Sequence, residues 1–146
     1  MHEIFLKRAI DLAREGKYLT KPNPMVGCVI VKDNEVIAEG YHMKYGSNHA
    51  EINALEDLNK NNNISEAEFR QLTLYCTLEP CCHHGKTGPC TDAIIKSGIK
   101  KVVIGIKDPN PKVSGSGIKQ LEDNGIEVLS GFFEEELIEL NKHFFF

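Results

Sequence analysis

No apolar run in this chain of 146 residues is long enough to span a bilayer, and Met1-His2-Glu3-Ile4 lacks the pattern of a secretory signal. Positive charge is not in excess either, since 17 lysines and arginines stand against 21 acidic residues, for a net charge of −4. Bulk charge therefore does not predict binding to a polyanion. From these absences we expect a cytoplasmic protein with neither a membrane nor a nucleic-acid partner.

A disulfide framework and a dinucleotide-binding domain are also not predicted. The five cysteines are an odd number in a chain without an export signal, which favours metal ligation and buried free thiols. Cys28 and Cys76 lie in apolar segments, so we expect them in the core. No GxGxxG motif follows a strand. The length predicts a single domain over residues 1–146.

Hydrophobic periodicity predicts an alternation of helices and strands. Helices are expected over residues 4–15, 50–58, 91–97, 118–123 and 134–142, and strands over residues 26–31, 36–41, 72–77, 102–106 and 126–129. The first two strands meet at a turn over Asp33-Asn34, which predicts a hairpin and hence a mixed sheet. This order favours an α/β layered domain over a bundle or a sandwich of sheets.

Two segments about thirty residues apart carry metal-binding side chains: His49-Ala50-Glu51 and Pro80-Cys81-Cys82-His83-His84-Gly85-Lys86-Thr87-Gly88-Pro89-Cys90. One imidazole and two thiolates are the ligands of a catalytic zinc ion with one open position. Glu51 adds a carboxylate that can move protons, and the combination is typical of zinc nucleobase deaminases. Because positions i and i+2 do not share a helix face, we expect His49 at the irregular start of its helix.

The spacing leaves two alternatives open. Cys82 competes with Cys81 as the ligand that follows the proline. The site could also be a structural zinc module, if Cys82 or His83 supplied a fourth ligand and closed it. In that case Glu51 would be replaceable without consequence.

The chain resembles the pyrimidine deaminase domain of the bifunctional deaminase/reductases of riboflavin biosynthesis, and the resemblance extends over essentially its whole length. The matching segments are Pro22-Asn23-Pro24-Met25-Val26-Gly27, Gly40-Tyr41-His42, His49-Ala50-Glu51, Thr77-Leu78-Glu79-Pro80-Cys81, Gly85-Lys86-Thr87 and Asp108-Pro109-Asn110-Pro111. The eight residues between Cys81 and Cys90 separate this family from cytidine and tRNA deaminases, which have a compact PCxxC. A different zinc deaminase, acting on cytosine nucleotides, guanine or tRNA adenosine, is the rival hypothesis.

The resemblance implies a cytidine-deaminase-like fold, a three-layer α/β/α sandwich around a mixed five-stranded sheet. It implies that His49, Cys81 and Cys90 bind Zn²⁺, with Cys81 preferred over Cys82, and that Glu51 is the proton shuttle. The implied reaction is hydrolytic deamination of a phosphorylated pyrimidine. Residues at positions that match substrate contacts are Asn23, His42, His83, Lys86, Thr87, Asp108 and Asn110.

Some of these residues have simpler explanations, and one part of the family pattern is missing. Asn23 and Asn110 stand beside prolines, where turn formation is the alternative role. The ammonium group of Lys86 is a compact positive charge, which suits it to bind a phosphate group. Family members usually continue into a reductase domain, whereas this chain stops at Phe146. We therefore expect that the reductase is a separate protein or that this is an excised domain. A separate expectation is that the protein forms a homo-oligomer.

Overall fold

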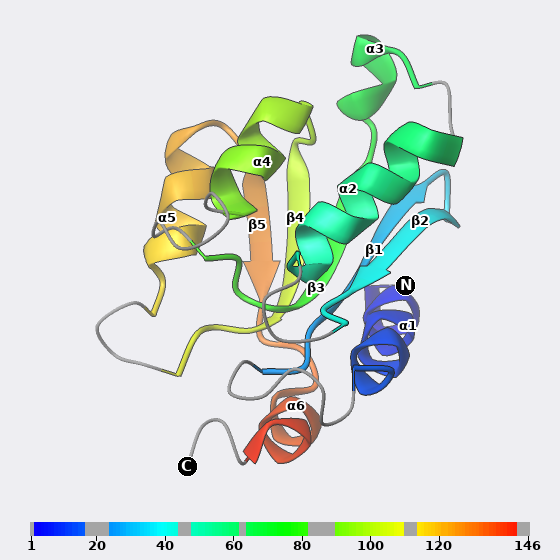
Figure 1. The fold of residues 1–146 in the computed structure, drawn as a ribbon. Helices are drawn as coiled ribbons and strands as arrows, with labels where there is room; N and C mark the ends of the chain where they lie inside the picture. The colour runs from blue at the N-terminus through cyan, green and yellow to red at the C-terminus, as the bar shows by residue number, and fades with distance from the viewer. Residues whose placement is uncertain are drawn as a thin grey trace.

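A mixed sheet of five strands runs through the middle of the molecule (Figure 1). The structure is a computed structural model and describes residues 2–16, 24–43, 48–61, 64–81, 90–109 and 114–142. The strands are β1 (Gly27–Lys32), β2 (Glu35–Tyr41), β3 (Thr73–Leu78), β4 (Lys101–Ile106) and β5 (Glu127–Ser130), in the order β2-β1-β3-β4-β5. β1 is antiparallel to β2 and β3, whereas β3, β4 and β5 are parallel, so the prediction of a mixed sheet is confirmed.

A two-residue turn joins β1 to β2, as the sequence predicts. Asp33 and Asn34 both have positive φ, 51° and 63°. Two consecutive left-handed residues form the type of turn whose twist matches an antiparallel hairpin, and short polar side chains tolerate this conformation. Lys32 therefore pairs with Glu35 directly across the turn.

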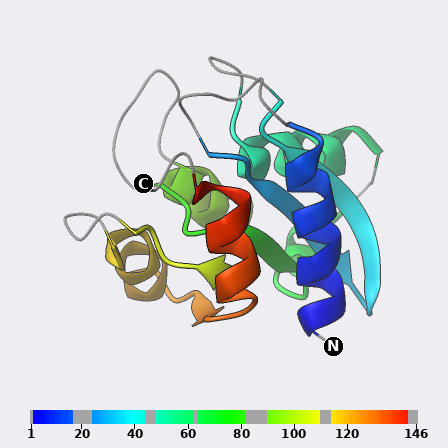
Figure 2. The same cartoon turned by 90° about the horizontal axis from the view of Figure 1, so that it is seen from below.

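Helices cover both faces of the sheet. Figure 2 shows α1 (His2–Arg14) and α6 (Glu134–Leu140) next to each other on the near face, where Lys7 and Arg14 both pair with Glu136. The other face carries α2 (Ala50–Asn61), α4 (Cys90–Ser97) and α5 (Ser116–Asp123). The three-layer architecture is therefore as expected.

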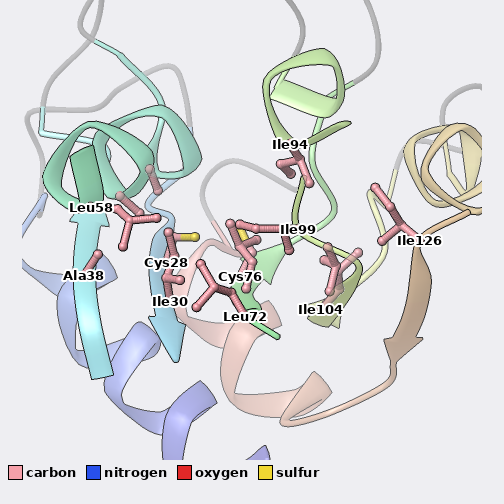
Figure 3. Close-up of a cluster of buried hydrophobic side chains, with 14 of the residues drawn as sticks. Cys28, Ile30, Ala38, Leu58, Leu72, Cys76, Ile94, Ile99, Ile104 and Ile126 are labelled. Atoms are coloured by element: carbon pink, nitrogen blue, oxygen red, sulfur yellow. The ribbon is translucent and has the colours of Figure 1, made fainter. Parts of the chain in front are cut away.

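The strands divide their side chains between two cores with a period of two residues. Cys28 and Ile30 of β1, with Cys76 of β3 and Ile104 of β4, pack under α2, α4 and α5 (Figure 3). The intervening residues, such as Val29, face α1. Cys28 and Cys76 are free, fully buried and directly opposite each other on neighbouring strands, which confirms them as core thiols.

The elements lie within a few residues of their predicted bounds, with one omission. The sequence analysis did not predict α3 (Glu66–Phe69), a single turn that begins at a capping box. The Ser65 side chain accepts from the Glu68 N–H, and the Glu68 carboxylate accepts from the Ser65 N–H. Within the described parts of the chain, no helix has the length and apolar character that crossing a membrane requires.

Candidate metal centre

Three element ends bring His49, Cys81 and Cys90 together. His49 directly precedes α2, and its carbonyl accepts the first helical hydrogen bond, from the Asn53 N–H at 3.0 Å. Cys81 follows β3, and Cys90 is the first residue of α4. His49 therefore lies at the cap of α2, before the regular helical turns, so the rule that residues i and i+2 point to different helix faces does not apply to His49 and Glu51. The irregular helix start that the sequence predicts is observed.

The spacing of the three donor atoms fits a zinc ion. His49 Nδ1 lies 3.3 Å from Cys90 Sγ and 3.8 Å from Cys81 Sγ, and all three donors lie within 4.8 Å of one another. Zinc bonds of about 2.0 Å to nitrogen and about 2.3 Å to sulfur, at tetrahedral angles, separate such atoms by about 3.6 Å. No large rearrangement is therefore needed for these residues to hold the ion.

Hydrogen bonding favours the thiolate form of one cysteine. Contacts from Cys90 and His49 lower the pKa of Cys81 to about 4, against the opposing effect of burial. The Cys90 backbone N–H, at the start of α4, also donates to Cys81 Sγ at 3.4 Å. The pKa of Cys90 is raised, because its thiol donates to Cys81 and is buried. The two sulfurs therefore share one proton, which metal binding would release.

Glu51 is a buried acid in the first turn of α2, with 4% of its surface exposed. Burial raises its pKa from an ordinary value of 4.5 to about 7, and the Cys81 thiolate adds to the rise. Glu51 lines the same cavity as His49 and Cys81. A carboxyl group with a pKa near neutrality can both accept and donate a proton at neutral pH.

Two of the residues predicted to contact substrate, His42 and Asp108, line this cavity. His42 Nδ1 lies 3.1 Å from the Asn48 carbonyl, which can only accept, so Nδ1 carries the proton. The His42 ring meets the His49 ring edge to face at 5.4 Å between centroids. Burial lowers the pKa of His42, which favours the neutral ring.

The other predicted substrate contacts lie outside the described residues: Asn23, His83, Lys86, Thr87 and Asn110. Cys82, the competitor of Cys81, lies outside them as well. The sequence analysis missed the apolar wall of the cavity, which Pro24, Val26 and Leu78 form, and gave no role to Glu79, which also lines it. The sequence feature that could have indicated Glu79 as a residue of the site is its position two residues before Cys81.

Comparisons with known proteins agree with this geometry. The family model described as the cytidine and deoxycytidylate deaminase zinc-binding region matches residues 1–106. The diaminohydroxyphosphoribosylamino-pyrimidine deaminase of Buchnera aphidicola subsp. Schizaphis graminum is 51% identical over 141 residues, which cover 97% of this chain and 91% of the relative. The riboflavin biosynthesis protein RibD of Actinobacillus pleuropneumoniae is 53% identical over 97% of this chain.

A solved structure is similar over nearly the whole fold. The diaminohydroxyphosphoribosylaminopyrimidine deaminase/reductase of Thermotoga maritima has a TM-score of 0.87 and 53% identity over 98% of this chain. This chain spans only 40% of the Thermotoga protein and 36% of the Actinobacillus protein, in contrast to the Buchnera deaminase.

Proposed function

Because this chain belongs to the cytidine and deoxycytidylate deaminase zinc-binding family, we propose that it deaminates a phosphoribosylated diaminopyrimidine in riboflavin biosynthesis. Water replaces the exocyclic amine of the ring, giving the aminouracil nucleotide and ammonia. One observation carries the proposal: a three-donor metal centre and a buried glutamate share a cavity in a chain 51% identical to a deaminase named for this substrate.

His49, Cys81 and Cys90 would hold the zinc ion, and three protein ligands leave one position open for catalysis. When bound, zinc supplies a Lewis acid that makes water nucleophilic near neutral pH. Glu51 accepts one proton of the attacking water and donates it to the ring nitrogen. It then takes a second proton from the hydroxyl group newly bound to the ring carbon and delivers it to the amine, which leaves as ammonia. Its burial supports this role, because a desolvated carboxyl group holds a proton more tightly than one in water.

The remaining predicted residues would recognise the rest of the substrate. The Asp108 carboxylate suits the hydroxyl groups of the sugar, and His42 is a second polar group in the wall of the same cavity. The chain has a net charge of −4, so overall electrostatics does not attract an anionic substrate. We assign the phosphate to Lys86, with Asn23, His83, Thr87 and Asn110 as further polar contacts.

The domain organisation is part of the proposal. Residues 1–146 would form one deaminase domain. The Thermotoga relative, whose name combines a deaminase and a reductase, is much longer than this chain. The reductase step would therefore fall to a further domain or to a separate protein.

The test is ammonia release from the phosphorylated pyrimidine, its dephosphorylated form, cytidine and deoxycytidylate. The phosphorylated pyrimidine should be much the best substrate, whereas turnover of cytosine nucleotides alone would favour the rival deaminase. Lys86→Ala should raise KM about 10- to 150-fold, the contribution of a charge-assisted contact of roughly 1.5–3 kcal/mol. Lys100→Ala, at an exposed position before β4, is the matched control. Equal turnover of both pyrimidine forms by the wild type would refute the role of Lys86.

A further inference from the structure

The Glu79 side chain is the hub of a hydrogen-bond network beside the metal centre. Only 6% of Glu79 is exposed. Its Oε1 accepts from the backbone N–H groups of Asp108 at 2.9 Å and Gly115 at 3.0 Å. Its Oε2 accepts from those of Gly117 at 2.9 Å and Ile118 at 3.2 Å. Four donors fill the acceptor sites of one carboxylate, so backbone groups on two other segments hold the Glu79 side chain in place.

Such N–H groups at a helix start ordinarily form a binding site for a phosphate or another anion. In this molecule the protein's own carboxylate occupies the first turn of α5. Gly115, the N-cap residue, has a φ of 84° and provides no side-chain cap. This helix start is therefore closed to a substrate phosphate, because the carboxylate of Glu79, which directly follows β3, caps it.

Close packing fixes the network in place. A Cβ atom on Gly117 would lie 2.2 Å from the Pro80 carbonyl oxygen and 3.3 Å from the Glu79 side chain. The start of α5 is thus pressed against the residue that precedes Cys81. The Glu79 N–H also donates to the Ile106 carbonyl at 3.0 Å, which ties the end of β3 to the end of β4.

These contacts join two parts of the same cavity. Glu79 lies two residues before Cys81, and Asp108 lies two residues after β4. We propose that Glu79 is a positioning residue that sets the place of Asp108 relative to the metal ligands, and thereby controls how tightly the substrate binds. This inference rests on the proposed function in taking Asp108 as a substrate contact.

Glu79→Gln tests the proposal with little change in side-chain shape. The amide keeps one oxygen but turns an NH₂ group toward two backbone N–H donors, so half of the network is lost. We expect KM to rise about tenfold, the equivalent of about 1.4 kcal/mol, while kcat changes less than about threefold. Zinc content should stay at one ion per chain. The matched control is Glu122→Gln, the same change at an exposed position of α5.

A double-mutant cycle separates positioning from a general loss of stability. If Glu79 acts through Asp108, Glu79→Gln should raise KM less than about twofold in an Asp108→Ala background. An equal rise in both backgrounds, an unchanged KM in the single variant or a loss of zinc would each overturn the proposal. Should Glu79→Gln fail to fold, Gly117→Ala displaces the same helix start, because its Cβ would lie 2.2 Å from the Pro80 carbonyl oxygen. It must then give the same KM defect, and a wild-type KM would refute the inference.

A measurement without substrate keeps this inference distinct from the proposed function. Wild-type protein that releases no ammonia from any pyrimidine would contradict the function. In that case, amide hydrogen exchange decides the positioning role. Exchange at Asp108 and over residues 115–118 should be at least about tenfold faster in Glu79→Gln, with metal content unchanged. Unaltered exchange at these amides would refute the role of Glu79.

Discussion

Replacing Glu51 by glutamine should remove activity while leaving the metal centre intact. The two side chains have nearly the same shape, and Glu51 is assigned no ligand role, so zinc should remain bound. The buried carboxyl group is the proposed proton carrier for more than one step. Loss of a general acid/base lowers turnover by about 10²–10⁴-fold. The barrier should therefore rise by about 3–5 kcal/mol.

The same substitution should stabilise protein whose metal has been removed by a chelator. Folding raises the pKa of Glu51 from 4.5 to about 7, so the folded state binds this proton more tightly than the unfolded state. Stability is therefore lost as pH rises from about 4.5 to about 7. At about 1.36 kcal/mol per pKa unit, the total is about 3 kcal/mol. Glutamine does not titrate and avoids this loss.

The assay compares urea unfolding of the two chelated proteins between pH 4 and pH 8. The difference in unfolding free energy should be near zero at the acid end and reach about 3 kcal/mol in favour of Glu51→Gln above pH 7. A constant difference across this range would refute the assigned pKa. Activity within tenfold of wild type would refute the catalytic role, and near-complete loss of zinc would make Glu51 a ligand.

Other substitutions test the ligands and the framework that holds them. Cys81→Ser should lose zinc and Cys82→Ser should keep it, as measured by metal analysis; the reverse result would mean that the ligand register is wrong. Asn141→Ala removes two hydrogen bonds to the backbone of the loop before β1 and should cost about 2 kcal/mol in urea unfolding. Ile104→Ala, at a fully buried position, should cost about 3 kcal/mol by the same assay, and a cost below 1 kcal/mol would contradict its core role. Gly40→Ala should cost about 3 kcal/mol and lower zinc occupancy, because its Cβ would lie 2.4 Å from the backbone of α2; a wild-type melting curve would refute this close packing.

The sequence determined the elements of this fold because local signals are strong in it. Alternating apolar residues predicted the buried strands, and Asp33-Asn34 predicted the hairpin turn, since tolerance of positive φ is a property of those residue types. The sequence also indicated the candidate metal ligands, because few combinations of side chains bind zinc, and the structure brings these three residues together. The single turn of α3 escaped prediction because four residues give no measurable periodicity.

The sequence did not determine how the residues of the candidate site come together in space. Spacing predicted that His49 stands at the start of its helix, but spacing alone could not choose between Cys81 and Cys82. The structure includes Cys81 in the donor cluster because the end of β3 brings it beside the first residue of α4. The roles of Asn23, His83, Lys86, Thr87 and Asn110 remain predictions from the sequence.

The position of Asp108 relative to the metal ligands was decided by tertiary structure alone. The Glu79 carboxylate accepts from the Asp108 N–H, 29 residues away, and from N–H groups at the start of α5, up to 39 residues away. Every residue except proline carries such a donor, so its use in a long-range contact leaves no mark in the pattern of residue types. The sequence therefore named the candidate metal ligands, whereas the contacts of Glu79 with Asp108 and with the start of α5 came from the tertiary structure.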